Sequence, residues 1–203
     1  MLHTLGFKRG GIVECIVTTY NTDGSPNAAP MGVYTLSDRE VVMKLHSGSD
    51  TLENISRIGC AVLNITYDAL LFLKSALLKH TPEVDPEELL CSALNAPYLK
   101  AAHAYAAVDA EVVKSYSLND SLGESRISVV KGRVREVRVL KPFPQAPCRG
   151  FFAAVELAID LSRGRRGREE ELMRTMRRTL PVREYREIEE FLKSLRIQTG
   201  SFR

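Results

Sequence analysis

The chain has 203 residues, and its 44% hydrophobic and 26% charged residues, with a net charge of +3, are typical of a folded globular protein and exclude disorder as its main state. No apolar run approaches the ~20 residues that a membrane-spanning helix needs, and residues 1–4 lack the pattern of a secretion signal. We therefore expect a cytoplasmic protein without a membrane partner. The cysteine spacing matches neither a zinc site nor a disulfide framework, which predicts isolated thiols at Cys15, Cys60, Cys91 and Cys148.

Positive charge is concentrated near the end of the chain. Residues 160–203 hold 12 Lys and Arg against 8 Asp and Glu, hence a net charge of +4. Glutamates interrupt these cations and the chain has no Trp, whereas nucleic-acid sites usually combine a basic face with aromatic side chains. The pattern favours a solvated helical surface, with the arginine-rich run at 163–168 as a turn. A nucleic-acid adaptor acting through this tail is the less favoured alternative.

The first half of the chain predicts a meander of three strands. Residues 12–20 are rich in β-branched side chains, and the turn that follows contains Asp23-Gly24. A second strand is expected at 27–35 and a third at 40–46, where apolar and polar residues alternate. Connections this short cannot cross over to a parallel neighbour, so the three strands should be antiparallel.

The hydrophobic period then changes from that of a strand to that of a helix. Apolar residues share one helical stripe at Leu52, Ile55 and Ile58. Gly59 should end this helix, and either Ser49 or Asp50 should cap its start. Another apolar strand is predicted at 60–66.

The remainder of the chain predicts an insertion, two more strands and a helical tail. The insertion, at about 69–105, is predicted as helical pieces at 70–78, 86–94 and 98–105. Strand patterns return at 108–116 and 126–140. After a proline-rich connector, helices are expected at 150–162, 168–180 and 182–195.

These elements predict a protein that is mainly β with α additions. Five or six antiparallel strands interrupted by helices are typical of a small closed or split barrel. We expect residues 1–140 to form this split barrel, with the insertion inside it. Residues 141–203 should form a C-terminal helical subdomain, because each of its helices has one apolar face and the linkers are short.

One polar loop has the properties of a phosphate site. His46 and Ser47 lead through Gly48 to Ser49 and into the predicted helix, where free N–H groups and the helix dipole favour an anion. The hydroxyls of Ser47, Ser49 and Thr51 would add donors. The loop lacks the glycine and lysine pattern of a nucleotide-hydrolysing loop. Taken alone, such a loop is more often an ordinary helix cap.

A second segment offers space for a flat ring. Pro30 interrupts the second strand among small residues, and a proline removes a donor from the sheet. Ala29 and Gly32 would let a planar group approach the backbone, and Met31 would supply a polarizable contact. An ordinary edge irregularity explains this segment equally well. Together, the two segments predict a site for a phosphorylated ring cofactor.

The chain resembles the FMN-binding split-barrel superfamily in three segments. These are residues 16–33 (Ile-Val-Thr-Thr-Tyr-Asn-Thr-Asp-Gly-Ser-Pro-Asn-Ala-Ala-Pro-Met-Gly-Val), 47–55 (Ser-Gly-Ser-Asp-Thr-Leu-Glu-Asn-Ile) and 61–66 (Ala-Val-Leu-Asn-Ile-Thr). Within the superfamily it is most similar to a largely archaeal family of uncharacterised proteins, domain of unknown function 447, close to the flavin reductases. The resemblance covers about residues 8–140, and the helical tail resembles that family's C-terminal region.

The resemblance implies a homodimer with FMN near the subunit interface. The flavin phosphate would be held by Ser47, Ser49 and Thr51, and the ring would lie along Ala29, Pro30, Met31 and Gly32. Asn54 would be either a direct phosphate ligand or a supporting residue.

The chain also departs from the flavin reductase pattern. Many flavin reductases have a basic residue in the phosphate loop, whereas this loop reads Ser-Gly-Ser-Asp, ending at Asp50. Lys44 or His46 on the preceding strand is the candidate source of positive charge. Residues 127–131 lack the histidine that flavin reductases often carry there, which leaves use of a nicotinamide donor open.

The resemblance therefore implies a flavin-dependent oxidoreductase acting on a small molecule that the sequence does not identify. A non-catalytic flavin-binding or scaffold protein is the alternative. No catalytic residue is named by the sequence. The four histidines lack ligand spacing, so no metal site is expected. Tyr98 is interpreted as a core or interface aromatic, with a substrate contact as the alternative.

Overall fold

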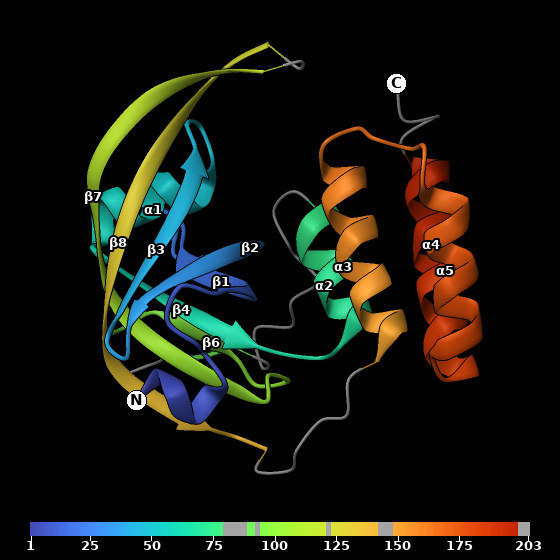
Figure 1. The fold of residues 1–203 in the computed structure, drawn as a ribbon, viewed down its shortest axis with the longest axis horizontal. Coiled ribbons are helices and arrows are strands. Elements are labelled where there is room, and N and C mark those ends of the chain that lie inside the picture. The colour runs from blue at the N-terminus through green and yellow to red at the C-terminus, as the bar shows by residue number, and fades with distance from the viewer. Residues whose placement is uncertain (79–88, 92–93, 121–122, 142–147, 199–203) are drawn as a thin grey trace. The chain divides into compact units, whose positions relative to one another are not determined.

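The chain folds as two units (Figure 1). The computed structural model describes residues 1–78, 89–91, 94–120, 123–141 and 148–198. The first unit comprises residues 1–66 and 80–143, and the second comprises residues 67–79 and 144–203.

Six strands of the first unit close into an antiparallel barrel in the order β1–β2–β3–β8–β7–β4 (Figure 1). They are β1 (Ile12–Tyr20), β2 (Pro26–Ser37), β3 (Glu40–His46), β4 (Cys60–Ile65), β7 (Ala104–Asp120) and β8 (Gly123–Val139). The barrel closes where β1 pairs with β4. The predicted antiparallel barrel is thus confirmed, and each predicted strand corresponds to one of these six.

Alternating side chains build the interior of the barrel. On β3, Met43 and Leu45 are buried in the core while Lys44 and His46 are exposed. The same core includes Cys15 and other side chains from every barrel strand. Burial raises the pKa of the Cys15 thiol, so this cysteine is a packing residue.

The helix α1 (Asp50–Ile58) lies between β3 and β4 in sequence, as predicted. Its C-terminal cap is Gly59, whose φ of 76° is a left-handed conformation that favours glycine. Leu52 and Ile55 are buried in the barrel core. Because α1 packs through this apolar face, its N-terminus is fixed relative to the strands.

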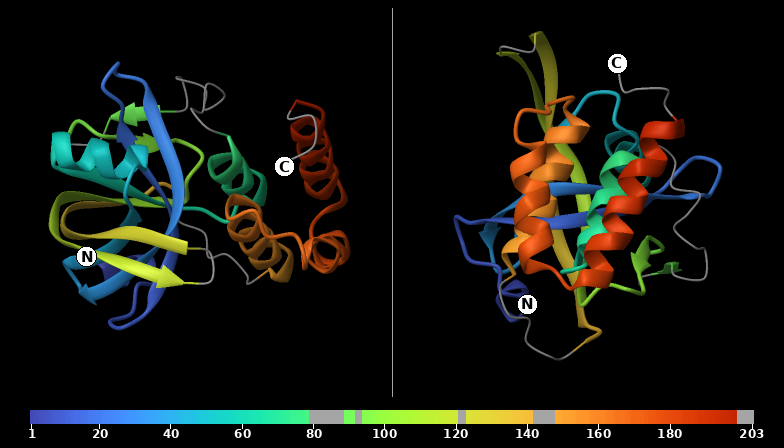
Figure 2. Two further views of the ribbon diagram at one scale, coloured as in Figure 1. Left: turned by 90° about the horizontal axis from the view of Figure 1, so that it is seen from above. Right: turned by 90° about the vertical axis from the view of Figure 1, so that its right-hand side faces the viewer.

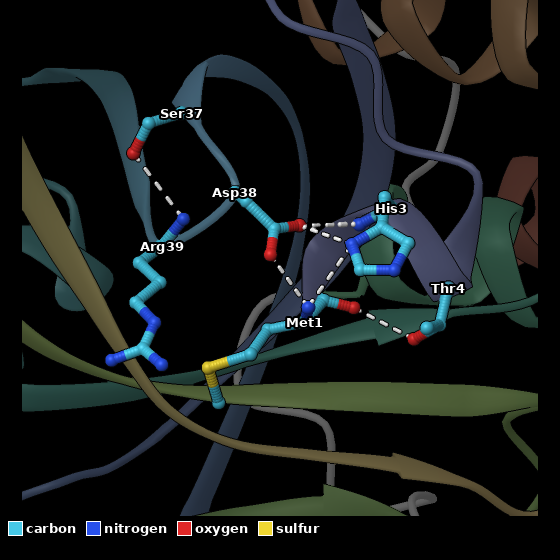
Figure 3. Close-up of polar contacts among 6 residues, drawn as sticks. All are labelled: Met1, His3, Thr4, Ser37, Asp38 and Arg39. Atoms are coloured by element: carbon cyan, nitrogen blue, oxygen red, sulfur yellow. Dashed lines mark hydrogen bonds and ion pairs between the residues drawn. The ribbon is translucent and has the colours of Figure 1, made fainter.

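The start of the chain is tied to the β2–β3 turn (Figure 3). Residues Leu2–Leu5 form a short 3-10 helix, η1. The Asp38 carboxylate accepts hydrogen bonds from the amino group of Met1 (2.7 Å) and the backbone N–H of His3 (2.9 Å), and it also contacts the His3 ring. The amino group of Met1 and the two His3 contacts hold the pKa of the Asp38 carboxyl well below its usual range.

The predicted insertion differs from the structure in two of its three pieces. Helix α2 (Ala69–Leu77) confirms the first piece, but α2 groups with the C-terminal helices rather than with the barrel. Residues Leu89–Cys91 form strand β5, so a helix at 86–94 is wrong there; the rest of that range, except Leu94, lies outside the described residues. Likewise β6 (Pro97–Leu99) pairs with β5, and a helix at 98–105 is wrong.

Tertiary contacts explain the strand at β6. The Asn64 side chain accepts a hydrogen bond from the Leu99 backbone N–H (2.8 Å), and the Thr18 hydroxyl donates to the Pro97 carbonyl oxygen. Tyr98 stacks on Tyr105 with ring centroids 4.5 Å apart. These contacts outweigh the local helical pattern, because they satisfy buried backbone groups and bury an aromatic pair.

The second unit consists of helices that lie alongside one another (Figure 2). They are α2, α3 (Arg149–Ser162), α4 (Glu169–Thr179) and α5 (Val182–Gln198), so the three predicted C-terminal helices are confirmed. Phe72 of α2 meets Phe151 of α3 edge to face, with centroids 5.6 Å apart. The predicted connector at 142–147 lies outside the described residues.

Many cations of the helical tail are neutralised by neighbouring acids. Arg168 bridges Glu156 and the buried Asp160. Pairs one helical turn apart join Arg174 to Glu170, Arg183 to Glu187 and Lys193 to Glu189. Such pairing is typical of a solvated helical surface. Over the described ranges, no helix has both the length and the apolar character needed to cross a membrane.

Candidate functional site: the β3–α1 loop and the β2 edge

The loop between β3 and α1 is fixed by backbone hydrogen bonds at both ends. The Ser47 N–H donates to the carbonyl oxygen of Arg126 on β8 (2.9 Å), and the Ser49 N–H donates to that of His46 (3.2 Å). Gly48 between them has a φ of 80°, a left-handed conformation that strains other residues. The loop is therefore held in one conformation, with the helix N-terminus directly behind it.

Ser49 is the N-cap of α1, but its hydroxyl makes no capping hydrogen bond. Instead, the N–H groups of Leu52 and Glu53 both reach its carbonyl oxygen. The Ser49 Oγ atom is buried and has no hydrogen-bond partner among the described residues. Leaving such a hydroxyl without a hydrogen bond costs about 1–3 kcal/mol. We therefore expect the Ser49 hydroxyl to donate a hydrogen bond to an acceptor on a bound ligand.

The first turn of α1 offers further donors to the same acceptor. The N–H groups of Asp50 and Thr51, the first two helical residues, precede those that bond to the Ser49 carbonyl oxygen and have no acceptor within the helix, and the positive end of the helix dipole lies there. Together with the Ser49 hydroxyl, this arrangement fits a phosphate group. Exposed Ser47 lies beside it in the loop.

Two predicted ligands, Thr51 and Asn54, are buried and belong to a polar cluster beneath the loop whose other members are buried or half-buried. The Asn54 Nδ2 group donates to Thr19 Oγ1 (3.0 Å) and to Asn21 Oδ1 (2.8 Å). The Asn27 Nδ2 group donates to Thr19 Oγ1 (3.1 Å) and to Thr51 Oγ1 (3.0 Å). We call these five residues the asparagine cluster.

Hydrogen bonds within the asparagine cluster determine which of its side chains still have a donor available for an anion. Both amide hydrogens of Asn54 are used inside the cluster, so its side chain has no donor left, which favours a supporting role. Thr51 accepts one hydrogen bond there and keeps its hydroxyl hydrogen. Thr19, Asn21 and Asn27 were not among the site residues predicted from the sequence. The sequence does show three polar residues around one hairpin turn. Only the strand register reveals that their side chains meet those of α1.

The segment from Ala29 to Gly32 lies on an edge of β2. It pairs with β1, where Pro30 faces Ile16, but β2 pairs with β3 only from Val33 onward. Within the described chain, residues 26–32 therefore have one strand neighbour. This accounts for Pro30, since a residue without an N–H is tolerated at a strand edge. The unpaired edge leaves backbone groups available to a planar ligand.

Two residues of this edge have packing roles as well. Met31 is partly buried against the barrel core. A Cβ atom added at Gly32 would lie 3.0 Å from Ile12 Cγ2, so the absence of a side chain there also serves the β1–β2 pairing. Ala29 and Pro30 are half-buried.

Three cationic or titratable side chains lie near the loop. Lys44 and His46 are exposed on the same face of β3, as their alternation predicts. Arg126 on β8 is also exposed, and its carbonyl oxygen holds the loop at Ser47. Arg126 was not among the site residues predicted from the sequence, because only the β3–β8 register places it beside the loop.

Comparison with known proteins identifies the family. Residues 13–139 match the family model "Protein of unknown function (DUF447) N-terminal domain". The chain belongs to the DUF447 family. An uncharacterized protein of Methanocaldococcus jannaschii is 30% identical over 154 residues, which cover 75% of this chain and 74% of that protein.

Solved structures show that this DUF447 chain shares its fold with an FMN-bound protein and with a component of a monooxygenase. An FMN-bound protein from Methanosarcina mazei, also described as DUF447, superposes with a TM-score of 0.71 at 24% identity, covering 93% of this chain and 97% of that one. Component B of nitrilotriacetate monooxygenase from Bacillus cereus superposes with a TM-score of 0.51 at 17% identity, covering 65% and 71%. The split barrel with C-terminal helices is therefore the family fold.

Other candidate residues of the DUF447 chain have structural explanations. Tyr98 is 7% exposed and stacked on Tyr105, which places it in the core rather than at a substrate surface. Burial and a hydrogen bond to Glu136 raise the pKa of Tyr105 to about 12. In the described portion of the chain, no three His, Cys, Asp or Glu residues cluster as metal ligands would. His80 lies outside that portion.

Proposed function

We propose that the chain binds FMN non-covalently and acts as a flavin-dependent oxidoreductase of the flavin reductase type. The observation that carries this proposal is the buried, unpartnered hydroxyl of Ser49 at the N-terminus of α1. A hydroxyl in that position fits a phosphate, and a structural relative of the same family is FMN-bound.

The residues divide into a phosphate group and a ring group. Ser47, Ser49 and Thr51 hold the phosphate, with positive charge from Lys44, His46 or Arg126. The ring lies along the unpaired β2 edge from Ala29 to Gly32. The two groups are connected, because Asn27 of β2 bonds to Thr51 of α1.

The chemistry divides between cofactor and protein. FMN supplies hydride transfer, while the chain positions it and controls access to its ring. The protein's tasks are to bind the phosphate, orient the ring and exclude water from the reacting face. The structure offers donors for the first task and an open strand edge for the second.

We further propose that the chain works as a homodimer with the flavin near the subunit interface. The outer part of the β7–β8 hairpin extends beyond the neighbouring strands (Figure 1). Three apolar side chains on β7, beyond the residues that pair with β4, are 36–49% exposed: Val112, Val113 and Tyr116. A second copy of the chain would remove this surface from water. Sedimentation of the native protein and of Tyr116→Glu tests this, and a native monomer contradicts it.

Flavin titration tests cofactor binding. We expect one FMN per chain, with a shift of the visible absorbance on binding. Ser49→Ala should weaken FMN binding about tenfold or more, the loss expected for one hydrogen bond to a charged group. Ser56→Ala is the matched control, because the Ser56 hydroxyl donates to the Leu52 carbonyl oxygen within α1. Equal affinity in all three proteins contradicts the phosphate site.

Anaerobic mixing with NADH and NADPH tests turnover. Bleaching of the bound flavin by either donor, followed by reoxidation with an added acceptor, is the expected result. Flavin that binds but is reduced by neither donor, and that passes electrons to no acceptor, favours the non-catalytic alternative.

A further inference from the structure

A charged cavity of about 610 Å³ opens on the outer wall of the barrel. Its lining comes from the β2–β3 turn, from β3, β7 and β8, and from Gly59 at the end of α1. Its charged residues are Arg39, Glu40, Asp109, Glu111, Lys131, Arg133 and Arg135. A volume of this size is in the range of small-molecule sites.

Two ion pairs neutralise part of this lining. Lys131 Nζ lies 2.7 Å from Glu40 Oε1. Arg135 forms an ion pair with Asp109. In the described ranges, no acid forms an ion pair with Arg39 or Arg133, whose side chains are exposed.

The two unpaired arginines are held next to each other by the backbone. The Val134 N–H donates to the Arg39 carbonyl oxygen (2.9 Å), which joins the β2–β3 turn to β8 beside Arg133. Glu40 is opposite Arg133 in the β3–β8 register, and Asp109 is opposite it in the β7–β8 register. Each of these acids is paired with another cation of the lining, Glu40 with Lys131 and Asp109 with Arg135. Both arginines line the cavity, and an anion bound there by two guanidinium groups offsets their mutual repulsion.

We propose that this cavity binds a small phosphate-bearing anion through the guanidinium groups of Arg39 and Arg133. Guanidinium groups match phosphate oxygens in a bidentate geometry. The acids of the lining disfavour an extended polyanion such as a nucleic acid, and among the described residues Glu111 forms no ion pair.

This anion site is separate from the β3–α1 loop. The loop lies at the N-terminus of α1, and Gly59 at the opposite end of that helix lines the cavity. A helix of nine residues is about 13 Å long. The inference therefore does not depend on the proposed flavin function.

Calorimetric titration with inorganic pyrophosphate at low salt tests the site. We expect saturable binding with one pyrophosphate per chain. Arg39→Gln and Arg133→Gln should each weaken it about tenfold or more. Arg9→Gln is the charge-matched control on the same unit, with an exposed side chain away from the cavity lining, and it should leave the affinity unchanged.

Three outcomes would overturn the proposal. The first is the absence of saturable binding, or an equal loss in Arg9→Gln. The second is a loss of FMN affinity in the cavity variants, which would make the cavity part of the flavin site. The third is a change of oligomeric state in Arg133→Gln, measured by light scattering, with unchanged pyrophosphate affinity, which would make this face an interface between copies. If FMN fails to bind any of the proteins while pyrophosphate binds as expected, only the flavin proposal fails.

Discussion

The side-chain amide of Asn27 on β2 donates a 3.0 Å hydrogen bond to the hydroxyl of Thr51 on α1. Asn27 precedes the strand edge at Ala29, and Thr51 lies in the first turn behind the β3–α1 loop. This contact joins the proposed ring position to the proposed phosphate position. The relative placement of the two halves thus depends on the asparagine cluster.

Asn54→Ala should lower the free energy of unfolding by about 1–3 kcal/mol, because it removes the donor to the half-buried Asn21 side-chain oxygen and one of the two donors to the buried Thr19 hydroxyl. It should also weaken FMN binding without removing any direct contact. Urea unfolding and flavin titration measure the two effects. Glu53→Ala, a change at an exposed neighbour, should affect stability much less. A stable Asn54→Ala protein would show that the cluster does not hold α1.

Asp50→Asn should tighten FMN binding about threefold to tenfold. Asp50 is exposed in the first turn of α1, and removing one negative charge near a phosphate relieves roughly 0.7–1.4 kcal/mol of repulsion. The gain should shrink as salt is added. Fluorescence titration at two salt concentrations measures it. An unchanged affinity at low salt would place the phosphate away from this loop.

Tyr98→Ala should destabilise the barrel by about 3–5 kcal/mol, because the Tyr98 ring is buried against Tyr105. Tyr98→Phe keeps the ring and should cost little. Thermal unfolding of both variants separates packing from a role of the hydroxyl. If Tyr98→Phe lost flavin-dependent activity at native stability, Tyr98 would be a substrate contact after all.

Low pH should weaken the contacts of the Asp38 carboxylate that hold η1 against the β2–β3 turn. The folded-state pKa of Asp38 is lowered, so its stabilising contribution is present above the unfolded pKa of about 3.9 and is lost as the pH falls below it. Asp38→Asn should remove this component of the pH dependence. Hydrogen exchange of residues 2–7 between pH 6 and pH 3 would measure the loosening. Identical profiles in the native protein and the variant would contradict this role for Asp38.

Periodicity predicted most of the barrel because its strands follow their own side-chain pattern. The alternation around Met43 and the helical stripe through Ile55 are both local signals of burial. At Tyr98 the local pattern was misleading. There Asn64, far away in sequence, binds the backbone of Leu99 and imposes a strand. Local patterns carry no information on such partners.

Part of the candidate site was predictable, because some of its residues are marked by the local sequence and others are not. Ser49 lies in a loop whose residue types alone indicate an anion site. Arg126 and Asn27 reach the site only through strand pairing and hairpin geometry. Their contribution depends on register, which composition and spacing do not specify.

The most direct test of the central claim is a crystal structure of the protein with FMN. The flavin phosphate should lie within hydrogen-bond distance of the Ser49 hydroxyl, at the N-terminus of α1. The ring should lie against the backbone of β2 between Ala29 and Gly32. An isoalloxazine bound elsewhere, with the Ser49 hydroxyl bonded to a protein group, would show that this loop is not the flavin phosphate site.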